Sequence, residues 1–221
     1  MRQKIKGGGL AGSFFGSILN RENKMKKLAL AVAVLAFAST VHANQFMTKF
    51  NLDIPGNYSI SNSGVTIDGN TNLGFGIGGE YYHPVNEQFT IGAGLEYQFG
   101  RKVSTMGGYT ITDSNAFGFA PLYGTVLFFP EIDLSGYKAF LKLNLGYNLS
   151  FYGNNDFKGS DTLTGGFYYA LGGGLDLSKN LRGEIMYGTY NGQEKTPSGF
   201  AIDCTYKKIG LSIGYLFDLK K

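Results

Sequence analysis

Three glycines in the stretch LGFGIGGEYYHP (residues 73–84) have the spacing of a dinucleotide-binding loop. Gly74, Gly76 and Gly79 fit the pattern G-x-G-x-x-G, in which glycines cradle a pyrophosphate at the start of a helix. A helix cannot begin here, because Pro84 blocks its continuation. Apolar residues instead alternate with glycine and polar residues along the stretch, which is the period of a β-strand. The pattern therefore predicts a strand and not a nucleotide site.

Few residues of the chain are of types that carry catalysis or bind metals. There are two histidines and one cysteine, and only His83 and Cys204 lie beyond residue 43. His83 falls beside Pro84 in a short predicted turn, where a histidine is more often solvated than a general base. One His and one Cys far apart in sequence do not have the spacing of zinc ligands. We therefore expect no catalytic site, no metal site and no cofactor.

Strands must position the remaining polar residues. Beyond residue 43 no segment has helical periodicity over a helix length, whereas runs of about ten alternating residues recur between turn-rich stretches. This length matches the roughly 9–11 residues of a tilted strand that crosses a bilayer. The sequence predicts an all-β fold with eight strands, at about 45–55, 72–83, 88–99, 115–129, 137–152, 166–177, 181–190 and 205–217.

Each run has one apolar face and one polar or glycine-rich face. A soluble β-sandwich would bury the apolar faces, and alternation alone does not exclude that architecture. The aromatic residues favour a membrane barrel, because they gather toward strand ends as in the two interfacial girdles of such barrels. The aromatic residues assigned to the apolar faces are Phe50, Tyr81, Tyr97, Phe99, Phe117, Phe119, Tyr123, Phe129, Tyr147, Phe151, Phe167, Tyr169, Tyr187, Tyr215 and Phe217.

The N-terminal region has the features of a secretory leader. Residues 25–43, MKKLALAVAVLAFASTVHA, combine two lysines, a short apolar run and an A-x-A-like cleavage site. We expect them to be a cleaved signal peptide, residues 1–24 to be an extra leader or translated upstream sequence, and residues 44–221 to be one domain. Of the 20 Lys and Arg and 16 Asp and Glu, seven and one lie in residues 1–43. The rest has a net charge of −2, so no basic patch for nucleic acid is expected.

The connections between the runs alternate in length. Those at 84–87, 130–136 and 178–180 are short, and those at 56–71, 100–114, 153–165 and 191–204 are long. In an up-and-down membrane barrel the short turns face the periplasm and the long loops face outward. The sequence therefore predicts an eight-stranded antiparallel transmembrane β-barrel with four long extracellular loops.

The chain resembles the small eight-stranded outer-membrane barrel family that includes OmpX-like, OmpW-like and opacity-type proteins, over residues 45–217. The resemblance is carried by the leader, by LGFGIGGEYY, by FAPLYGTVLFFP before a short turn and by the closing IGLSIGYLF. It implies export to the bacterial outer membrane. One departure is at the C-terminus, where four residues follow Phe217, although such barrels usually end on an aromatic residue.

Charged residues on the polar faces would point into the barrel. Unpaired charges are costly in so narrow an interior, so we predict a neutral, hydrogen-bonded network. An eight-stranded interior is just wide enough for side chains to fill, which favours a plug over a proton or solute path. The predicted lumen network comprises Glu80, Glu96, Lys138, Lys142, Asp176, Arg182, Glu184 and Lys208, with Lys49 and Asp53 on the same faces.

These features predict an integral outer-membrane barrel without catalysis, with a structural or surface-interaction role such as adhesion. The expected partners are outer-membrane lipid and, through the long loops, an extracellular ligand or a host surface, because binding usually resides in loops on a rigid scaffold. One alternative is a narrow channel for small, hydrophobic solutes. The other is a secreted soluble β-sandwich.

Overall fold

A computed structural model describes residues 45–112, 116–132, 134, 136–152, 162–195 and 201–219. The predicted signal peptide and the residues before it lie outside the described residues. No helix in the described ranges is long and apolar enough to cross a membrane.

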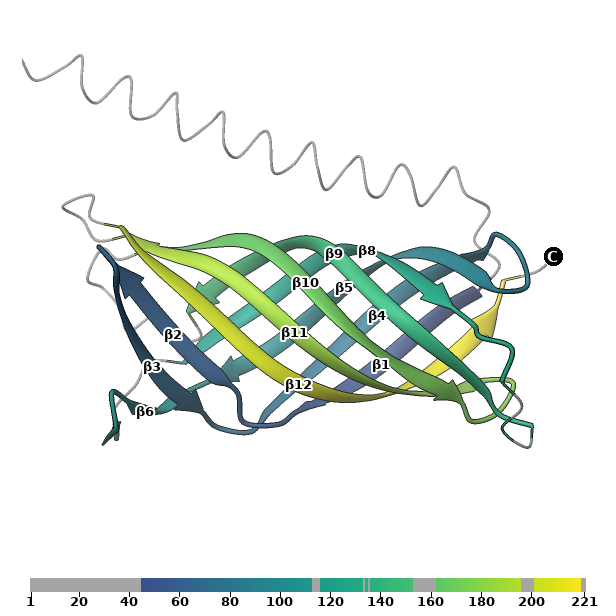
Figure 1. Ribbon diagram of the computed structural model, residues 1–221, viewed down its shortest axis with the longest axis horizontal. Helices are drawn as coiled ribbons and strands as arrows, with labels where there is room; N and C mark the ends of the chain where they lie inside the picture. The colour runs from purple at the N-terminus through teal and green to yellow at the C-terminus, as the bar shows by residue number, and fades with distance from the viewer. Residues whose placement is uncertain are drawn as a thin grey trace, which may run out of the picture. The chain divides into compact units, whose positions relative to one another are not determined.

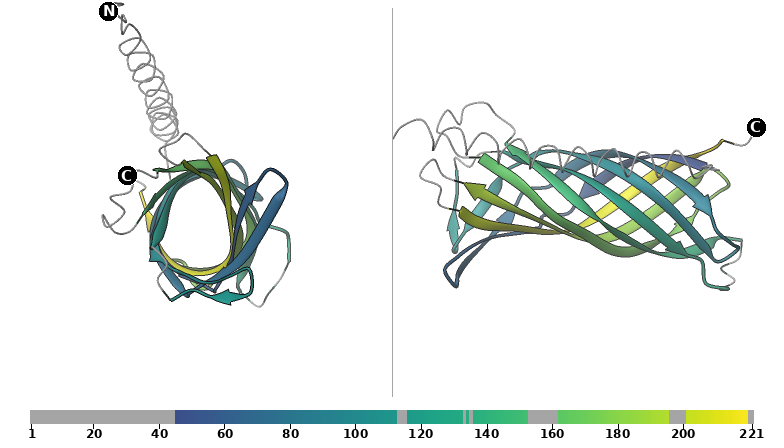
Figure 2. Two further views of the ribbon diagram at one scale, coloured as in Figure 1. Left: turned by 90° about the vertical axis from the view of Figure 1, so that its left-hand side faces the viewer. Right: turned by 90° about the horizontal axis from the view of Figure 1, so that it is seen from above.

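Eight long antiparallel strands form a closed wall (Figure 1). They follow one another around the barrel in chain order, and the last strand pairs with the first, which closes the ring seen along the barrel in Figure 2. This confirms the predicted up-and-down barrel and excludes the sandwich. The wall strands are β1 (Gln45–Asp53), β4 (Gly74–Pro84), β5 (Phe89–Arg101), β8 (Phe117–Phe128), β9 (Lys138–Tyr152), β10 (Thr162–Asp176), β11 (Leu181–Lys195) and β12 (Ala201–Asp218).

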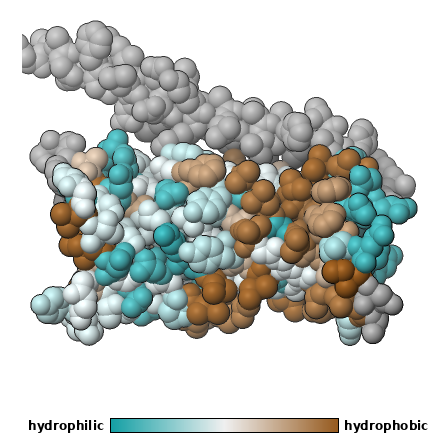
Figure 3. Space-filling model, viewed as in Figure 1, coloured by the Kyte–Doolittle hydropathy of each residue, from teal (hydrophilic) through white to brown (hydrophobic). Residues whose placement is uncertain are grey.

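The alternation of apolar and polar residues in β5 shows why the strands close into a barrel. Leu95, Tyr97 and Phe99 point outward and are about half exposed, whereas Glu96 and Gln98 between them are buried in the lumen. The outer face can therefore lie against lipid, while closure leaves the wall without an open backbone edge. On the face in Figure 3, apolar side chains gather over the half of the barrel nearer the short turns.

The connections alternate in length as predicted, so the barrel has a short-turn end and a hairpin end. The short turns follow β4, β8 and β10, and both Gln45 and Asp218 lie at this end, opposite each other in the ladder. In the first turn Asn86 Oδ1 accepts hydrogen bonds from the backbone N–H groups of Gln88 and Phe89 at 2.9 and 2.7 Å. This Asx-type turn reverses the chain within four residues.

The predicted loop at 56–71 is instead a β-hairpin, made of β2 (Asn57–Asn62) and β3 (Val65–Thr71). Asn57 lies opposite Asn70, which is the register that the β1–β4 ladder would reach if it ran on without an insertion. β2 also pairs with residues 203–207 of β12, near the hairpin end of that strand. The hairpin thus continues the barrel wall beyond the break at residues 54–56.

The two-residue turn of this hairpin explains why it forms. Ser63 and Gly64 have φ values of 48° and 84°, and two positive φ angles define the type I′ turn whose twist matches that of paired strands. The predicted loop at 100–114 contains a second short hairpin, β6 (Val103–Met106) and β7 (Tyr109–Thr110), around Gly107 and Gly108. The prediction of loops is therefore wrong in local structure at both places, because polar stretches on either side of a tight turn pair as short hairpins.

The faces of β8 are opposite to the predicted ones. Phe117, Phe119 and Tyr123 are buried in the lumen and Phe129 packs toward it, whereas Gly124 lies on the exposed outer face. Both faces of FGFAPLYGTVLF carry apolar residues, so the period of two was visible but did not indicate which face meets lipid. The other aromatic residues predicted on the apolar faces do lie on the outer face.

Candidate functional site

The centre of the lumen is a carboxylate that receives four donors. Glu80 on β4 is fully buried, and its Oε1 lies 2.8 Å from Lys49 Nζ and accepts the Tyr123 hydroxyl at 2.6 Å. Its Oε2 lies 2.7 Å from Lys142 Nζ and also accepts the Tyr82 hydroxyl. Two cations and two hydroxyls thus compensate for the loss of hydration of this carboxylate.

A second carboxylate makes this arrangement neutral. Glu184 Oε1 on β11 lies 2.8 Å from Lys142 Nζ, and its Oε2 lies 3.9 Å from Lys49 Nζ. The Ser212 hydroxyl donates to the same carboxylate at 3.3 Å. We call Lys49, Glu80, Lys142 and Glu184 the central group, and its two positive and two negative charges cancel.

Nearer the hairpin end lies a second set of charges, which we call the upper group. Asp53 on β1 accepts from Arg101 Nη2 at 2.6 Å through one oxygen and from Lys208 Nζ through the other. Arg101 Nη1 also donates to the Tyr206 hydroxyl at 2.8 Å. All three charged side chains are buried, and together they carry a net charge of +1.

Glu96 on β5 lies between the two groups and supplies the missing negative charge. Its Oε2 is 3.5 Å from Lys49 Nζ in the central group, and its Oε1 is 3.6 Å from Lys208 Nζ in the upper group. The Gln98 amide donates to Oε1 at 2.8 Å. Among the described residues, both ion pairs that connect the two groups run through Glu96, and both are longer than the pairs that Glu80 makes at 2.7 and 2.8 Å.

At the short-turn end an arginine is enclosed by aromatic rings. Arg182 Nε donates to Asp176 Oδ1 at 2.6 Å, and its Nη2 donates to Oδ2 at 3.2 Å. Its guanidinium carbon lies 4.6 Å from the ring centre of Phe140 and 5.2 Å from that of Tyr82, within the range of cation–π attraction. Apolar side chains fill the lumen around this pair: Met47, Tyr82, Leu127, Phe140 and Leu216.

The structure brings most of the residues of the predicted lumen network together, with one difference. Glu80, Glu96, Lys142, Glu184 and Lys208 lie in the chain of contacts above, and Asp176 and Arg182 form their own pair. Lys138 does not belong to the buried set. It begins β9 and is exposed at the short-turn end, because inward-facing residues at a strand end open to solvent.

Arg101 is a buried member that alternation did not find. Counting by twos from Glu96 and Gln98 places residue 101 on the outer face, within the predicted loop. A register shift between Gln98 and Arg101 in the β5–β8 ladder inserts one residue and turns Arg101 inward. The signal available in the sequence was Gly100 directly before it, since glycine within a strand often marks a bulge.

Aromatic rings fill the lumen beyond the upper group. The ring of Tyr190 lies 4.8 Å from that of Tyr168 and 5.3 Å from that of Phe119, and Phe119 stacks on Tyr206 at 5.6 Å. The Arg101 guanidinium carbon lies 5.2 Å from the centre of the Tyr206 ring. Charged and aromatic layers therefore follow each other along the barrel and occupy its cross-section.

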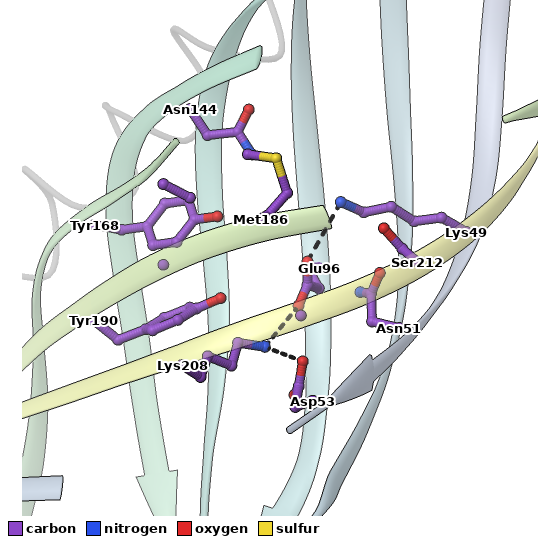
Figure 4. A pocket seen from close by; sticks show the side chains of 13 residues that line it. Lys49, Asn51, Asp53, Glu96, Asn144, Tyr168, Met186, Tyr190, Lys208 and Ser212 are labelled. Carbon is purple, nitrogen blue, oxygen red and sulfur yellow. Dashed lines mark hydrogen bonds and ion pairs between the residues drawn. The ribbon is translucent and has the colours of Figure 1, made fainter. Parts of the chain in front are cut away.

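A small cavity remains where Glu96 joins the two groups (Figure 4). The volume open to the centres of water molecules is about 20 Å³, which suits one water. Asn51 and Asn144 line this cavity and are at least nine-tenths buried, and Asn51 Nδ2 and Asn144 Oδ1 have no hydrogen-bond partner among the described atoms. The close-up shows the ion pairs of Glu96 at the edge of this space.

The arrangement is suited to closure and not to acid–base chemistry. Its carboxylates and cations are held by each other, which leaves none of them poised toward a substrate. No group of three His, Cys, Asp or Glu side chains with metal-binding geometry occurs among the described residues. Cys204 is buried at the hairpin end, which keeps its thiol away from substrates.

Comparison with known proteins identifies the architecture. No protein-family model matches the sequence, and no match was found among curated proteins. Among solved structures the chain is similar to the outer membrane protein OprG from Pseudomonas aeruginosa, with 15% sequence identity and a TM-score of 0.50 over 80% of this chain and 97% of that chain. It is also similar to the outer membrane protein AlkL (12% identity, TM-score 0.48, 81% and 92% covered) and to Neisserial surface protein A (12%, 0.44, 78% and 97%). At such identities the similarity concerns the fold, and the closed ring with its apolar outer face agrees with it: this chain is an eight-stranded antiparallel transmembrane β-barrel with the fold of small outer-membrane proteins.

Proposed function

We propose that this chain is a bacterial outer-membrane protein whose barrel is closed and whose function is to present an interaction surface outside the cell. The observation that carries the proposal is the filled lumen, in which five buried or partly buried cations face five carboxylates and two clusters of apolar and aromatic side chains pack around them. Such a filled interior leaves the hairpin end as the part of the molecule available to partners.

The outer face of the wall changes character at the break at residues 54–56. On the short-turn side of the break, the apolar side chains of Phe50, Phe75 and Ile77 are exposed on the outer face, as expected of a surface in contact with lipid. On the hairpin side of the break, the outer face of the β2–β3 hairpin is a ladder of hydroxyl, amide and carboxylate side chains, in which the Ser59 hydroxyl donates to Asp68 at 2.6 Å. This change marks the height at which the wall leaves the hydrocarbon, so the hairpin lies in the aqueous layer where a host surface or ligand is met.

Catalysis has no place in this proposal. His83 lies near the end of β4 at the short-turn end, far along the strand from the hairpins. A surface-directed reaction would need its base at the other end.

Trimming the first hairpin tests the proposal. A variant that lacks residues 59–62 and 65–68 keeps the Ser63–Gly64 turn, and it removes an even number of residues from each strand, so the pleat and the pairing phase are preserved. We expect this variant to fold, as shown by a mobility shift between unheated and heated samples on a detergent gel. Cells that display it should aggregate with each other and attach to glycan-coated and protein-coated surfaces less than cells with the wild-type chain.

The matched control is Glu87→Gln in the exposed turn at the opposite end, which should attach like wild type. Equal attachment by the trimmed variant, with the barrel intact, would contradict a role for this hairpin.

A second candidate function is binding or passage of small apolar solutes. The observation behind it is the apolar character of the lumen inside the hairpin end, where Tyr58, Leu163 and Cys204 lie beside the rings of Phe119 and Tyr190 around a gap too small for a water molecule, so a solute would have to displace these side chains. Under this alternative, solute uptake by cells would respond to Leu163→Asp at this gap and not to trimming of the hairpin.

A further inference from the structure

We infer that the cavity beside Glu96 is a water site in the middle of the lumen. We also infer that the Glu96 carboxylate joins the two charged groups and keeps small anions out of this cavity. The inference rests on the closed barrel proposed above and assigns the connection between its two charged groups to one side chain. Its starting point is the cavity lined by Lys49, Asn51, Glu96, Asn144 and Lys208.

The occupant of the cavity is set by its size and its polar atoms. The space suits one water-sized molecule, and the unpartnered Asn51 Nδ2 and Asn144 Oδ1 offer one donor and one acceptor. A buried polar atom without a partner costs about 1–3 kcal/mol, and a water molecule can supply both kinds of hydrogen bond. Because the surrounding charges cancel, a neutral molecule fits the site better than an ion.

The contacts of Glu96 differ from those of the other buried carboxylates. Glu80 has cations at 2.7 and 2.8 Å. The two cations at Glu96 lie at 3.5 and 3.6 Å, one on each side of it. Its carboxylate therefore occupies the position that a small anion would take between two ammonium groups, and both of its ion pairs are longer than the shortest pairs of Glu80, Glu184 and Asp53.

Removing the charge of Glu96 has a defined consequence. The central group stays neutral, and the upper group keeps its net charge of +1 beside an existing cavity. Lys49, Lys208 and the Asn51 amide would then present N–H donors with no carboxylate between them, which is the chemistry of a halide site.

The test compares wild type with Glu96→Gln, using bromide as the probe. For the variant we expect the midpoint of urea unfolding to rise with bromide concentration, because the anion would bind the folded barrel and not the unfolded chain. The wild-type chain should show no such dependence. The double variant Glu96→Gln, Lys208→Met restores neutrality and should lose the bromide dependence.

The inference is overturned if the unfolding midpoint of Glu96→Gln does not depend on bromide. That outcome leaves the closed barrel standing, whereas ion-conducting wild-type protein would refute the closed barrel itself. A crystal structure of the wild-type protein tests the water site independently of any variant. We expect one water within hydrogen-bond distance of Asn51 Nδ2 or Asn144 Oδ1, and an empty cavity would overturn the assignment.

Discussion

Replacing Glu80 with glutamine is expected to lower the free energy of unfolding by about 3–5 kcal/mol, the usual cost of removing one partner from a buried ion pair. The substitution preserves the shape of the side chain but removes the carboxylate nearest to both Lys49 and Lys142, which are buried with it. It also leaves two tyrosine hydroxyls with a weaker acceptor. Urea titration in lipid vesicles measures the effect through the different gel mobilities of folded and unfolded chain, since the protein has no tryptophan to report unfolding.

Glu87→Gln is the matched control for this experiment. Glu87 is exposed in the first short turn, so its substitution should change the free energy of unfolding by no more than about 0.5 kcal/mol. If Glu80→Gln were as mild as this control, the central group would not hold the barrel together.

Arginine on the lipid face should be the second large effect. Leu143 lies near the middle of β9 and is 39% exposed on the outer face. An arginine at the bilayer midplane costs about 2–4 kcal/mol in such barrels, so Leu143→Arg should lower the free energy of unfolding by that amount. Leu145→Arg, two residues further on the same face, should behave in the same way.

The neighbouring position separates lipid exposure from bulk. Asn144 is 1% exposed and lines the lumen cavity. The cost of Asn144→Arg therefore depends on packing and charge inside the barrel, and it should respond to a compensating Lys208→Met, which removes a nearby cation. Leu143→Arg should not respond. The alternation of β9 would be contradicted if arginine lowered the free energy of unfolding equally at positions 143, 144 and 145, and if Lys208→Met did not change the effect at 144.

The sequence was sufficient to predict the architecture where one property alternated cleanly. In β5, Glu96 and Gln98 are polar between apolar neighbours. This one pattern predicts that the segment is a strand, which face of it meets lipid, and that Glu96 and Gln98 point into the lumen. The same reasoning placed Glu80, Lys142 and Glu184 inside. Ion pairing in a narrow interior then follows from physical chemistry, although which cation meets which carboxylate depends on strand register, which a single strand does not encode.

The structure differs from the prediction where the local sequence is ambiguous. In β8 the inward Tyr123 and the outward Leu122 are both apolar in character, so the period was visible and its phase was not. Arg101 turns inward through a bulge, which shifts the phase within a strand. The hairpin tip at Ser63 and Gly64 is a turn signal of only two residues, and the strands that flank it are polar on their outer face, so they lack the apolar alternation by which the other strands were predicted.

The central claim of this account is that the wild-type lumen is closed by its own side chains. Single-channel recording of the purified protein in a planar bilayer tests it most directly. The layered lumen predicts a flat baseline without steady conductance steps, because the charged groups and the rings of Phe119, Tyr190 and Tyr206 fill the cross-section. Large, steady single-channel steps from the wild-type protein would contradict the claim.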